Sequence, residues 1–551
     1  MLNIRIIYIC CLILTFASCK MKDEITCYGG SDSDLVQLLE KEGYTLKFYP
    51  SVSEALQNAP EKSGVLLLSD SYPVKGTSIS QEDESLIEAK SLRVLVEFPQ
   101  RIGTTDSSKS DTLNLERIVV CDSINTELPF MSLLSFNRCI LKETSDSINH
   151  PILVAAKVAG FDKAVYGLKD TETRPVLYYR TPHLLVSTTC ISHFASDRYM
   201  PEQKIKSLYE YIFRWLLSKN TVTFSSWITY ITPSYTPSDV LPENAGYESI
   251  KKGIEWFYNG HFLVNSEWKQ NWVDKYMGDG TMPIGPSIPD QFQNGDGSLG
   301  VLEGHMSEIR YDGSQLYRYW MRADVQGEAS YAFAAAGDLL ENNEYSKVAT
   351  NLIDYSFKEY RDSERNDPAS PSYGLLGWAY THKGTYYGDD NARFLLGVIA
   401  SSALLNDTEW DKKIAEGIIG NFRTTGINGF RGGSLLDTDI QKRGWKSFYD
   451  NNTVNLHAHF EAWNWACYLW LYNQTQYEPL LERSKKALSM MMASYPEQWS
   501  WTNGIQQERA RMILPLAWLY RVEPTEEHLK WLHYMTNELS LIHISEPTRH
   551  L

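Results

Sequence analysis

The chain has 551 residues, of which 43% are hydrophobic, 13% aromatic and 22% charged. This length excludes a single small module, and this composition excludes a disordered chain. The 52 basic and 68 acidic residues give a net charge of -16, a field that repels nucleic acids and anionic lipid surfaces, so we expect no nucleic-acid partner.

The N-terminus has the layout of a secretory signal. An apolar run at residues 6–16 follows Arg5, and the small residues Ala17 and Ser18 precede Cys19. The run is too short for a membrane-spanning helix. A cysteine directly after small residues resembles a bacterial lipobox.

This resemblance implies that residues 1–18 form a signal peptide and that Cys19 is the lipidated first residue of the mature chain. The charged residues 20–24 resemble the signal that sends lipoproteins of Bacteroidota to the cell surface. We therefore expect a chain that is lipid-anchored in the outer membrane, either surface-exposed or periplasmic. The alternative is ordinary signal cleavage beside an unmodified cysteine.

Cysteine spacing and short motifs point to neither a metal nor a cofactor. The cysteines of the mature chain after Cys19 are odd in number and scattered, with no CxxC spacing. Nothing resembles HExxH, a P-loop or an EF-hand, and Gly29-Gly30 is not a dinucleotide-binding fingerprint. We expect no cofactor and no metal, and structural thiols at Cys27, Cys121, Cys139, Cys190 and Cys467.

Residues 19–220 alternate short apolar, β-rich runs with helical stretches. Continuous apolar strands interleaved with helices predict a mostly parallel, doubly wound α/β sheet. The expected strands are residues 25–28, 46–49, 65–68, 93–98, 175–179 and 184–188, and the expected helices are residues 34–42, 81–92 and 201–217.

This pattern resembles class-I glutamine-amidotransferase-like domains, whose enzymes place a nucleophilic cysteine on a sharp turn between a strand and a helix. Here the turn after the strand at 93–98 covers residues 99–102, Pro-Gln-Arg-Ile, and holds no cysteine. We therefore expect a non-catalytic domain that serves assembly, including self-association, or contributes contacts to the rim of the site.

Residues 221–246 are expected to form a linker, and residues 247–538 to form pairs of long helices. In each pair the helix with more aromatic residues follows a long loop, and the helix with more charged and fewer aromatic residues follows a short loop. This pairing predicts an all-α toroid of the (α/α)6 type, whereas a TPR-like array would need a tighter period and short loops. The expected helices are residues 247–263, 315–340, 344–360, 389–405, 411–425, 454–472, 478–494, 506–521 and 525–538.

The last residues, 539–551, resemble the translation of a sequencing-library adapter. We therefore expect the natural chain to continue past Glu538 and the toroid to be truncated at its C-terminus. No fold or function is predicted for residues 539–551.

The long loops gather aromatic and polar residues on the expected rim of the toroid. Aromatic rings stack on the C–H faces of sugars, while charged and amide groups bind the hydroxyls. Trp378, Tyr387 and His305 are candidate substrate-binding residues on this basis. The alternative is that the Trp and Tyr side chains fill the interior of a large toroid.

The stretch 386–397 places Asp389 and Asp390 where a helix begins. One carboxylate can cap the first turn, which is the structural alternative. The other is a candidate general acid or base, with Arg393 on the next turn tuning it or holding a substrate carboxylate. Glycosidic cleavage needs a proton donor and a second group that activates water or attacks the sugar.

Residues 388–397, Gly-Asp-Asp-Asn-Ala-Arg-Phe-Leu-Leu-Gly, resemble the start of an inner helix in six-hairpin glycosidases such as the unsaturated uronyl hydrolases. The resemblance implies that an aspartate at this start is catalytic. The order of lipoprotein signal, amidotransferase-like domain and helical toroid is similar to that of the β-glucuronidases of glycoside hydrolase family 154. This similarity implies β-glucuronate as the sugar that is released.

Two other expected inner helices begin with charged residues. Asp324 and Glu328 are one turn apart and rank second as catalytic candidates, and Arg322 is placed to bind an anionic substrate. Glu508 and Arg509 open the helix at 506–521 and are candidates for substrate binding, with capping as the alternative role.

The expected helix at 454–472 carries a polar stripe that includes His457 and Glu461. A polar stripe on a buried helix needs partners, which are either a sugar or a satisfied structural network. His457 and His459 are about 200° apart around a helix, so they cannot bind one metal ion together.

These observations predict a glycoside hydrolase that removes a terminal uronic acid from a polysaccharide or oligosaccharide by carboxylate acid–base chemistry. A first rival is a polysaccharide lyase, in which His457, Tyr449 or Asn452 would neutralise the uronate and remove its C5 proton. A second rival is a non-catalytic glycan-binding lipoprotein, which the aromatic residues would serve equally well.

Overall fold

The chain forms two compact units in the computed structural model, which describes residues 23–107, 109–144, 148, 150–231, 234–235 and 239–549. The expected signal peptide and Cys19 lie outside the described residues. The first unit is Met1–Asp239 with Ser307–Gln315, and the second is Val240–Met306 with Leu316–Leu551. No helix among the described residues is long and apolar enough to cross a membrane.

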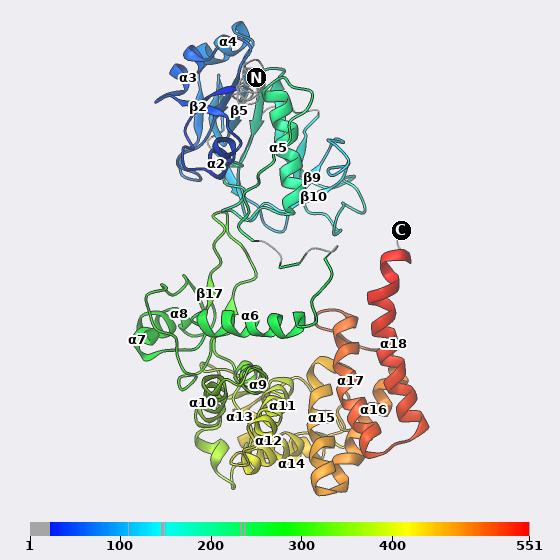
Figure 1. Cartoon of the computed structure of the whole chain (residues 1–551). Coiled ribbons are helices and arrows are strands. Elements are labelled where there is room, and N and C mark those ends of the chain that lie inside the picture. The colour runs from blue at the N-terminus through cyan, green and yellow to red at the C-terminus, as the bar shows by residue number, and fades with distance from the viewer. Residues whose placement is uncertain are drawn as a thin grey trace, which may run out of the picture. The chain divides into compact units, whose positions relative to one another are not determined.

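The first unit is built on a mixed sheet of nine strands (Figure 1). Strands β2, β1, β3, β5 and β14 are parallel neighbours in that order, whereas β14, β13, β12, β9 and β10 are antiparallel neighbours. The strands are β1 (Glu24–Tyr28), β2 (Thr45–Phe48), β3 (Gly64–Leu67), β5 (Arg93–Glu97), β9 (Arg117–Val120), β10 (Leu133–Leu134), β12 (Leu153–Ala156), β13 (Thr173–Thr181) and β14 (Leu184–Ser187).

The predicted mostly parallel, doubly wound, amidotransferase-like domain is wrong, because half of this sheet is antiparallel. Pro182 and His183 join β13 to β14 as a tight hairpin, a connection that forces antiparallel pairing. Strands β9, β10 and β12 lie in a stretch where no strand was expected. A continuous apolar run indicates that both faces of a strand are buried, but it carries no information about strand direction.

Helices cover both faces of the sheet. Alternate residues of β3 face opposite sides: Leu66 packs with α2 and α5, whereas Val65 and Leu67 pack with α3 and α4. The helices are α2 (Asp34–Lys41), α3 (Val52–Asn58), α4 (Gln81–Ala89) and α5 (Glu202–Leu216), and the remaining strands of this unit are β4 (Thr77–Ile79), β6 (Pro99–Ile102), β7 (Thr105–Asp106), β8 (Ser110–Thr112) and β11 (Ile140–Lys142).

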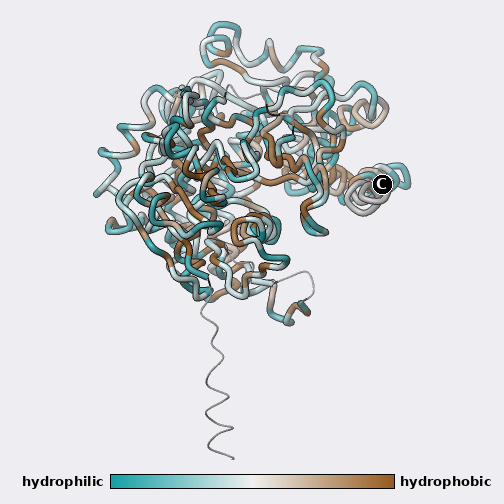
Figure 2. Tube along the Cα trace, turned by 90° about the horizontal axis from the view of Figure 1, so that it is seen from above, coloured by the Kyte–Doolittle hydropathy of each residue, from teal (hydrophilic) through white to brown (hydrophobic). Residues whose placement is uncertain are grey.

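The second unit is formed by helical hairpins. Inner helices α9, α11, α15 and α17 pack side by side in that order, and α10, α12, α16 and α18 are their outer partners (Figure 1). Hydrophobic (brown) and hydrophilic (teal) segments alternate along the Cα trace (Figure 2). The helices are α6 (Ala245–Asn259), α9 (Ala323–Leu339), α10 (Asn343–Glu359), α11 (Gly388–Leu405), α12 (Asp411–Arg423), α15 (Ala458–Thr475), α16 (Glu478–Ser494), α17 (Ile505–Val522) and α18 (Glu526–Arg549).

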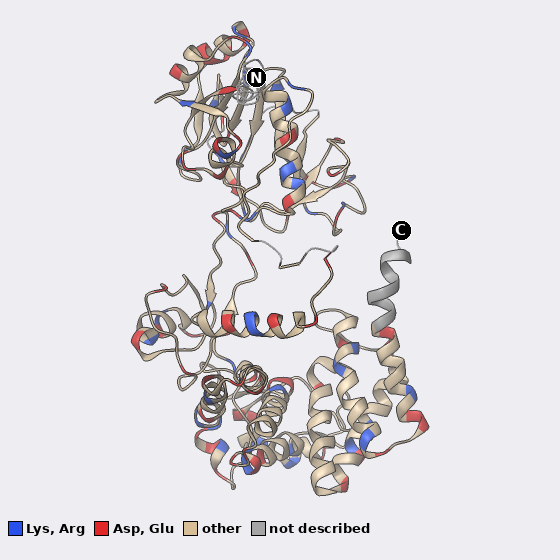
Figure 3. Ribbon diagram, viewed as in Figure 1, with Lys and Arg blue, Asp and Glu red and all other residues tan. Residues whose placement is uncertain are grey.

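For the predicted (α/α)6-type toroid, expected to be truncated at its C-terminus, the described residues show an all-α row of four consecutive hairpins, from α9 and α10 to α17 and α18, and no closed ring of six. Helices α9 and α11 make the closest contact in this row, because each contributes a glycine. A Cβ atom on Gly397 would lie 2.2 Å from the carbonyl oxygen of Gly327. Helix α15 contains a single charged residue, Glu461, as expected for a buried helix (Figure 3).

Long loops precede the inner helices and carry short elements of their own. A two-stranded sheet of β18 and β19 leads directly into α11. The short elements are α7 (Ser266–Lys269), a π-helical turn (Gln270–Asp274), α8 (Lys275–Met277), a 3-10 turn (Ser363–Asn366), α13 (Asp437–Arg443), α14 (Lys446–Tyr449), β15 (Ile284–Gly285), β16 (Gly304–His305), β17 (Tyr317–Arg318), β18 (Thr385–Tyr387) and β19 (Ser434–Leu436).

Candidate active site

A polar cavity of about 370 Å³ lies where the N-terminal ends of α9, α11, α15 and α17 converge. Backbone N–H groups at helix N-termini carry partial positive charge, which favours anions at this position. The cavity combines carboxylates, cations, amides and aromatic rings. Its lining residues are Arg322, Trp378, Tyr387, Asp389, Asp390, Arg393, His459, Phe460, Asn503, Gln507 and Arg511.

The two aspartates of α11 face this cavity and do not act as caps. Strand β18 delivers the chain to Gly388, and the N-cap residue, Tyr387, makes no side-chain capping bond. Asp389 and Asp390 are 4% and 5% exposed, and the Oδ1 atom of each is buried without a hydrogen-bond partner. Buried unpartnered carboxylate oxygens are costly and are typical of sites that bind a ligand.

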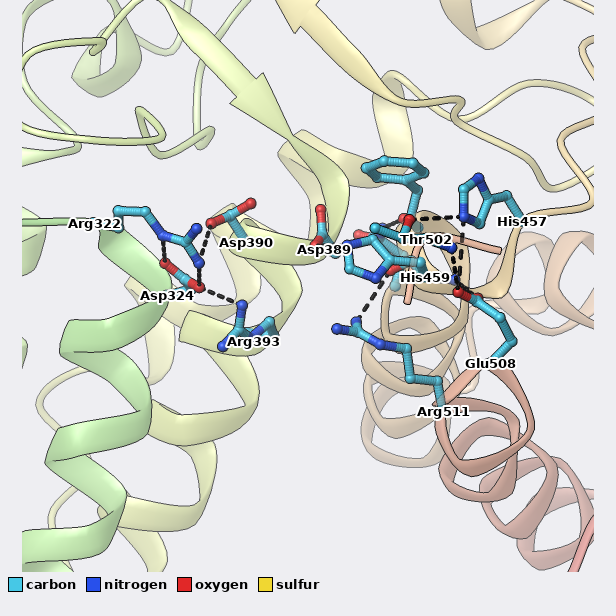
Figure 4. A network of polar contacts seen from close by, with 12 residues as sticks. Arg322, Asp324, Asp389, Asp390, Arg393, His457, His459, Thr502, Glu508 and Arg511 are labelled. Atoms are coloured by element: carbon cyan, nitrogen blue, oxygen red, sulfur yellow. Dashed lines mark hydrogen bonds and ion pairs between the residues drawn. The ribbon is translucent and has the colours of Figure 1, made fainter. Parts of the chain in front are cut away.

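Asp324 does not itself line the cavity but pairs with two arginines that do, Arg322 and Arg393 (Figure 4). It is fully buried in the first turn of α9, where Arg322 Nε donates to its Oδ1 at 3.0 Å and Arg393 forms an ion pair with its Oδ2. Burial acts to raise the pKa of Asp324, but the charges of Arg322 and Arg393 outweigh it, and the pKa falls below its usual value.

Asp390 is the protonated partner of this pair. Its Oδ1 atom lies 3.5 Å from Arg322 Nη2, the same nitrogen that contacts Asp324. Burial, followed by the negative charges of Asp324 and Asp389, raises the pKa of Asp390 to about 9. Asp390 is therefore a neutral carboxylic acid at pH 7, the state that a general acid requires.

Asp389 lies on the other side of the cavity beside His459, whose Nε2 is 3.4 Å from Asp389 Oδ2. Burial raises the pKa of Asp389, while the nearby charge of Arg511 opposes this shift. Burial, together with the charge of Arg511, lowers the pKa of His459 to about 4. A neutral imidazole therefore faces Asp389, and its Nδ1 atom is buried without a partner.

Glu508 fixes the segment that carries His459. It is fully buried in the first turn of α17 and accepts hydrogen bonds from the backbone N–H groups of His459 and Thr502. Thr502 Oγ1 in turn lies 2.9 Å from His457 Nε2, which is 3.7 Å from Glu508 Oε1 (Figure 4). Glu508 therefore holds the start of α15 and the 499–504 loop together from beneath the cavity.

Glu461 belongs to a structural network and does not line the cavity. Its carboxylate accepts from the backbone N–H of Arg431 at 3.0 Å, from that of Gly432 at 2.7 Å and from Asn455 Nδ2 at 2.9 Å. Burial raises the pKa of Glu461 to about 7. These bonds anchor the loop after α12 and leave Glu461 without a free face toward substrate.

Of the other predicted residues, Glu328, His305 and Arg509 also lie outside the cavity lining, as do His457 and Glu508. Glu328 makes a bidentate pair with Arg393, at 2.7 and 2.6 Å, and its side chain is 44% exposed. His305 on β16 packs against the rings of Tyr317, Phe262 and Trp256. Arg509 points to Glu538, 3.4 Å away, and to the ring of Tyr495.

Sequence reasoning missed Arg511, His459, Phe460, Asn503 and Gln507. The usable signal for Arg511 was its position one turn after Glu508 on an inner helix. His459 had been considered only as a metal ligand paired with His457. Among the described residues, no group of three or more His, Cys, Asp or Glu side chains is arranged to hold a metal ion.

A larger hollow of about 760 Å³ adjoins this cavity and shares Arg393 with it. Its other walls are mostly apolar, with Trp463, Trp470 and Trp518 among them. The larger hollow lacks a pair of titratable groups with opposed pKa shifts. The smaller polar cavity is therefore the better candidate for chemistry.

No family model and no curated protein match the chain. Solved structures similar to parts of it include an α-amylase from Clostridium perfringens, at 12% identity over 44% of this chain and 67% of that chain, with a TM-score of 0.29. A sugar epimerase from a ruminal bacterium matches at 12% identity over 53% and 70%, with a TM-score of 0.34. A D-mannose isomerase matches at 10% identity over 55% and 87%, with a TM-score of 0.33. All three are named as sugar-processing enzymes, but scores of this size carry no argument about this chain.

Proposed function

We propose that this protein is a glycoside hydrolase that removes a terminal uronic acid, with β-glucuronate favoured, from a polysaccharide or oligosaccharide. The observation that carries the proposal is the carboxyl pair of α11, in which Asp390 is protonated at neutral pH and Asp389 lines the same cavity. Two carboxyl groups in one cavity, one of them held as an acid, can supply both an acid and a base.

In the proposed reaction Asp390 donates its proton to the glycosidic oxygen as the bond to the anomeric carbon breaks. A water molecule attacks the anomeric carbon and gives a proton to Asp389, with the neutral His459 imidazole beside it to orient that water. The products are a free sugar and an alcohol. Proton exchange with solvent then returns Asp390 to its acid form.

The remaining lining supports a sugar as the substrate. Trp378, Tyr387 and Phe460 present aromatic rings to the cavity, and Asn503 and Gln507 present amides suited to hydroxyl groups. The similarity of residues 388–397 to the uronyl hydrolases supports a uronic acid, as do the arginines that line the cavity.

The lyase alternative has less support, because its residues are not gathered at the cavity. Tyr449 on α14 packs against Phe422 and lies under Arg483, whose guanidinium is 3.5 Å from the ring centroid. Neither Tyr449 nor Asn452 lines the cavity. A lyase would also form a conjugated product, so growth of ultraviolet absorbance during turnover would contradict the hydrolase proposal.

The test is hydrolysis of aryl glycosides and uronic-acid oligosaccharides by the wild type and by the Asp389→Asn and Asp390→Asn variants. We expect the wild type to release the uronic acid and each variant to lose at least about 100-fold in kcat. The matched control is Asp411→Asn, which removes an exposed first-turn aspartate from the neighbouring α12. Retained hydrolysis by both α11 variants would refute the catalytic assignment, and absence of turnover on every glycoside would favour a glycan-binding role.

We also propose that the chain is exported and lipidated at Cys19, which would anchor it in the outer membrane. The support is the order of charged, apolar and small residues before that cysteine. Metabolic labelling with a radioactive fatty acid should label the wild type and not a Cys19→Ser variant. Equal labelling of the two would exclude this lipidation site.

A further inference from the structure

We propose that Arg511 binds the carboxylate of the substrate and sets the preference for an acidic sugar. This inference rests on the proposed function and names the group that recognises the substrate class. Three arginines line the cavity, namely Arg322, Arg393 and Arg511. They differ in whether a carboxylate of the protein already neutralises them.

Arg322 and Arg393 are already paired within the protein. Arg322 contacts Asp324 through two nitrogens and lies 3.7 Å from Glu303. Arg393 pairs with Asp324 and makes two hydrogen bonds to Glu328. A substrate carboxylate would have to compete with these bidentate contacts, so both side chains serve better as part of the cavity wall.

Arg511 has no such partner among the described residues, because no carboxylate there lies within the 4.0 Å limit for an ion pair. Its side chain is buried, with 7% exposure. Nη1 donates to the backbone carbonyl oxygen of His459 at 3.1 Å, and Nε is buried without a partner. Burial lowers the pKa of Arg511, yet a guanidinium stays protonated in proteins. The carboxylates of Asp389 and Glu508 act on Arg511 without forming an ion pair with it, so the guanidinium can bind an anionic ligand directly.

The position of Arg511 suits a carboxylate next to the reacting bond. Its guanidinium lies 4.3 Å from the centroid of the Trp463 ring, which holds the side chain in one orientation. The residue that it contacts, His459, lies beside Asp389. Gln507, one turn earlier on α17, also lines the cavity. A uronate bound by Arg511 would therefore lie with its ring next to Asp389 and Asp390 (Figure 4).

The first test compares kcat/KM for an aryl glucuronide and the matching aryl glucoside in the wild type, Arg511→Gln and Arg511→Lys. We expect Arg511→Gln to lose about 100-fold or more on the glucuronide and less than about 5-fold on the glucoside. Arg511→Lys should be intermediate, because it keeps the charge but loses the planar fork. The control is Arg521→Gln, which removes an exposed cation from the same helix and should leave the ratio unchanged.

The second test measures binding without turnover. Calorimetry on the wild type should give tighter binding for free glucuronate than for glucuronamide, which replaces the carboxylate with a neutral amide. Arg511→Gln should remove that difference. This ligand comparison in the wild type needs no substitution and therefore does not depend on whether a variant folds.

These outcomes separate this inference from the proposed function. Binding of glucuronate that depends on Arg511, with no hydrolysis of any glycoside, would support the inference and refute the hydrolase proposal. Hydrolysis with a glucuronide-to-glucoside ratio unchanged within about 3-fold in folded Arg511→Gln would overturn the inference and leave the hydrolase proposal intact. Equal affinity of the wild type for glucuronate and glucuronamide would also overturn it.

Discussion

Replacing Asp324 with Asn should move the alkaline limit of activity to lower pH. Asp324 and Asp390 share a contact with Arg322 Nη2, so their carboxylates lie on the order of 5 Å apart. At an effective dielectric constant of ~20, two unit charges at that separation repel by about 3 kcal/mol, which corresponds to ~2 pKa units. Removing Asp324 also frees Arg322 and Arg393 to stabilise the ionised form of Asp390.

The sign of the shift follows from which form of Asp390 is active. The wild type needs protonated Asp390, so kcat/KM should fall as pH rises through about 9. In Asp324→Asn the pKa of Asp390 is lower, and the fall should begin near pH ~7. The assay is the pH dependence of kcat/KM on the preferred glycoside between pH ~5 and ~10, with circular dichroism at each pH to confirm folding.

The matched control for this prediction is Glu328→Gln. Glu328 pairs with the same Arg393, but its side chain is 44% exposed, so solvent screens its charge and the alkaline limit should move by less than about half a unit. An unmoved alkaline limit in folded Asp324→Asn would show that Asp324 does not hold the proton on Asp390. Burial and Asp389 would then have to account for the raised pKa of Asp390 without Asp324.

The remaining predictions concern stability and positioning. Folded Asp390 has a pKa of about 9 against ~3.9 unfolded, so stability should fall as pH rises between these values, by up to ~1.4 kcal/mol for each pH unit. Asp390→Asn should therefore exceed the wild type in urea unfolding at pH ~8 by several kcal/mol but match it at pH ~4. Equal stability at both pH values would count against the shift. Glu508→Gln should lower kcat by roughly 10-fold with little change in KM, because it weakens the hydrogen bond that holds the His459 backbone and leaves the sugar contacts in place. An unchanged kcat would show that Glu508 does not position His459. Gly397→Ala should lower the free energy of unfolding in urea by about 1–3 kcal/mol, because the new Cβ atom meets the Gly327 carbonyl. Gly253→Ala, in open space on α6, should raise it by about 0.5–1 kcal/mol. The same sign for both variants would contradict the packing argument.

The helices were more predictable than the sheet because their signals are local. Residues 478–494 were expected as a helix from periodicity, and α16 covers Glu478–Ser494. Strands β9 and β10 are short and pair with each other, and β9 is joined to the rest of the sheet through β12, much later in the chain. Strand direction also depends on how the chain connects in space, which an apolar run does not encode.

The site was predictable where a single helix start carries it, and not where two helices must be aligned. Asp389 and Asp390 were found because one short motif holds both. His457 and Glu461 do not lie on one stripe of a helix, as was predicted. Helix α15 begins at Ala458, so His457 is an extended N-cap residue. The two side chains therefore bind different networks, and Arg511 and His459 meet only through the packing of α15 on α17.

The charge of the cavity explains how a protein with a net charge of -16 can admit an anionic sugar. With Asp390 protonated, Arg322 and Arg393 are paired with Asp324 and Glu328, and the charge of Arg511 meets at most one charge on Asp389. Ionisation of Asp390 would add a negative charge at the point where the sugar binds. Under the proposed function, the proton on Asp390 would serve the reaction and would also keep the cavity from repelling a uronate. Its loss at high pH should therefore impair both binding and turnover of an acidic glycoside, but only turnover of a neutral one.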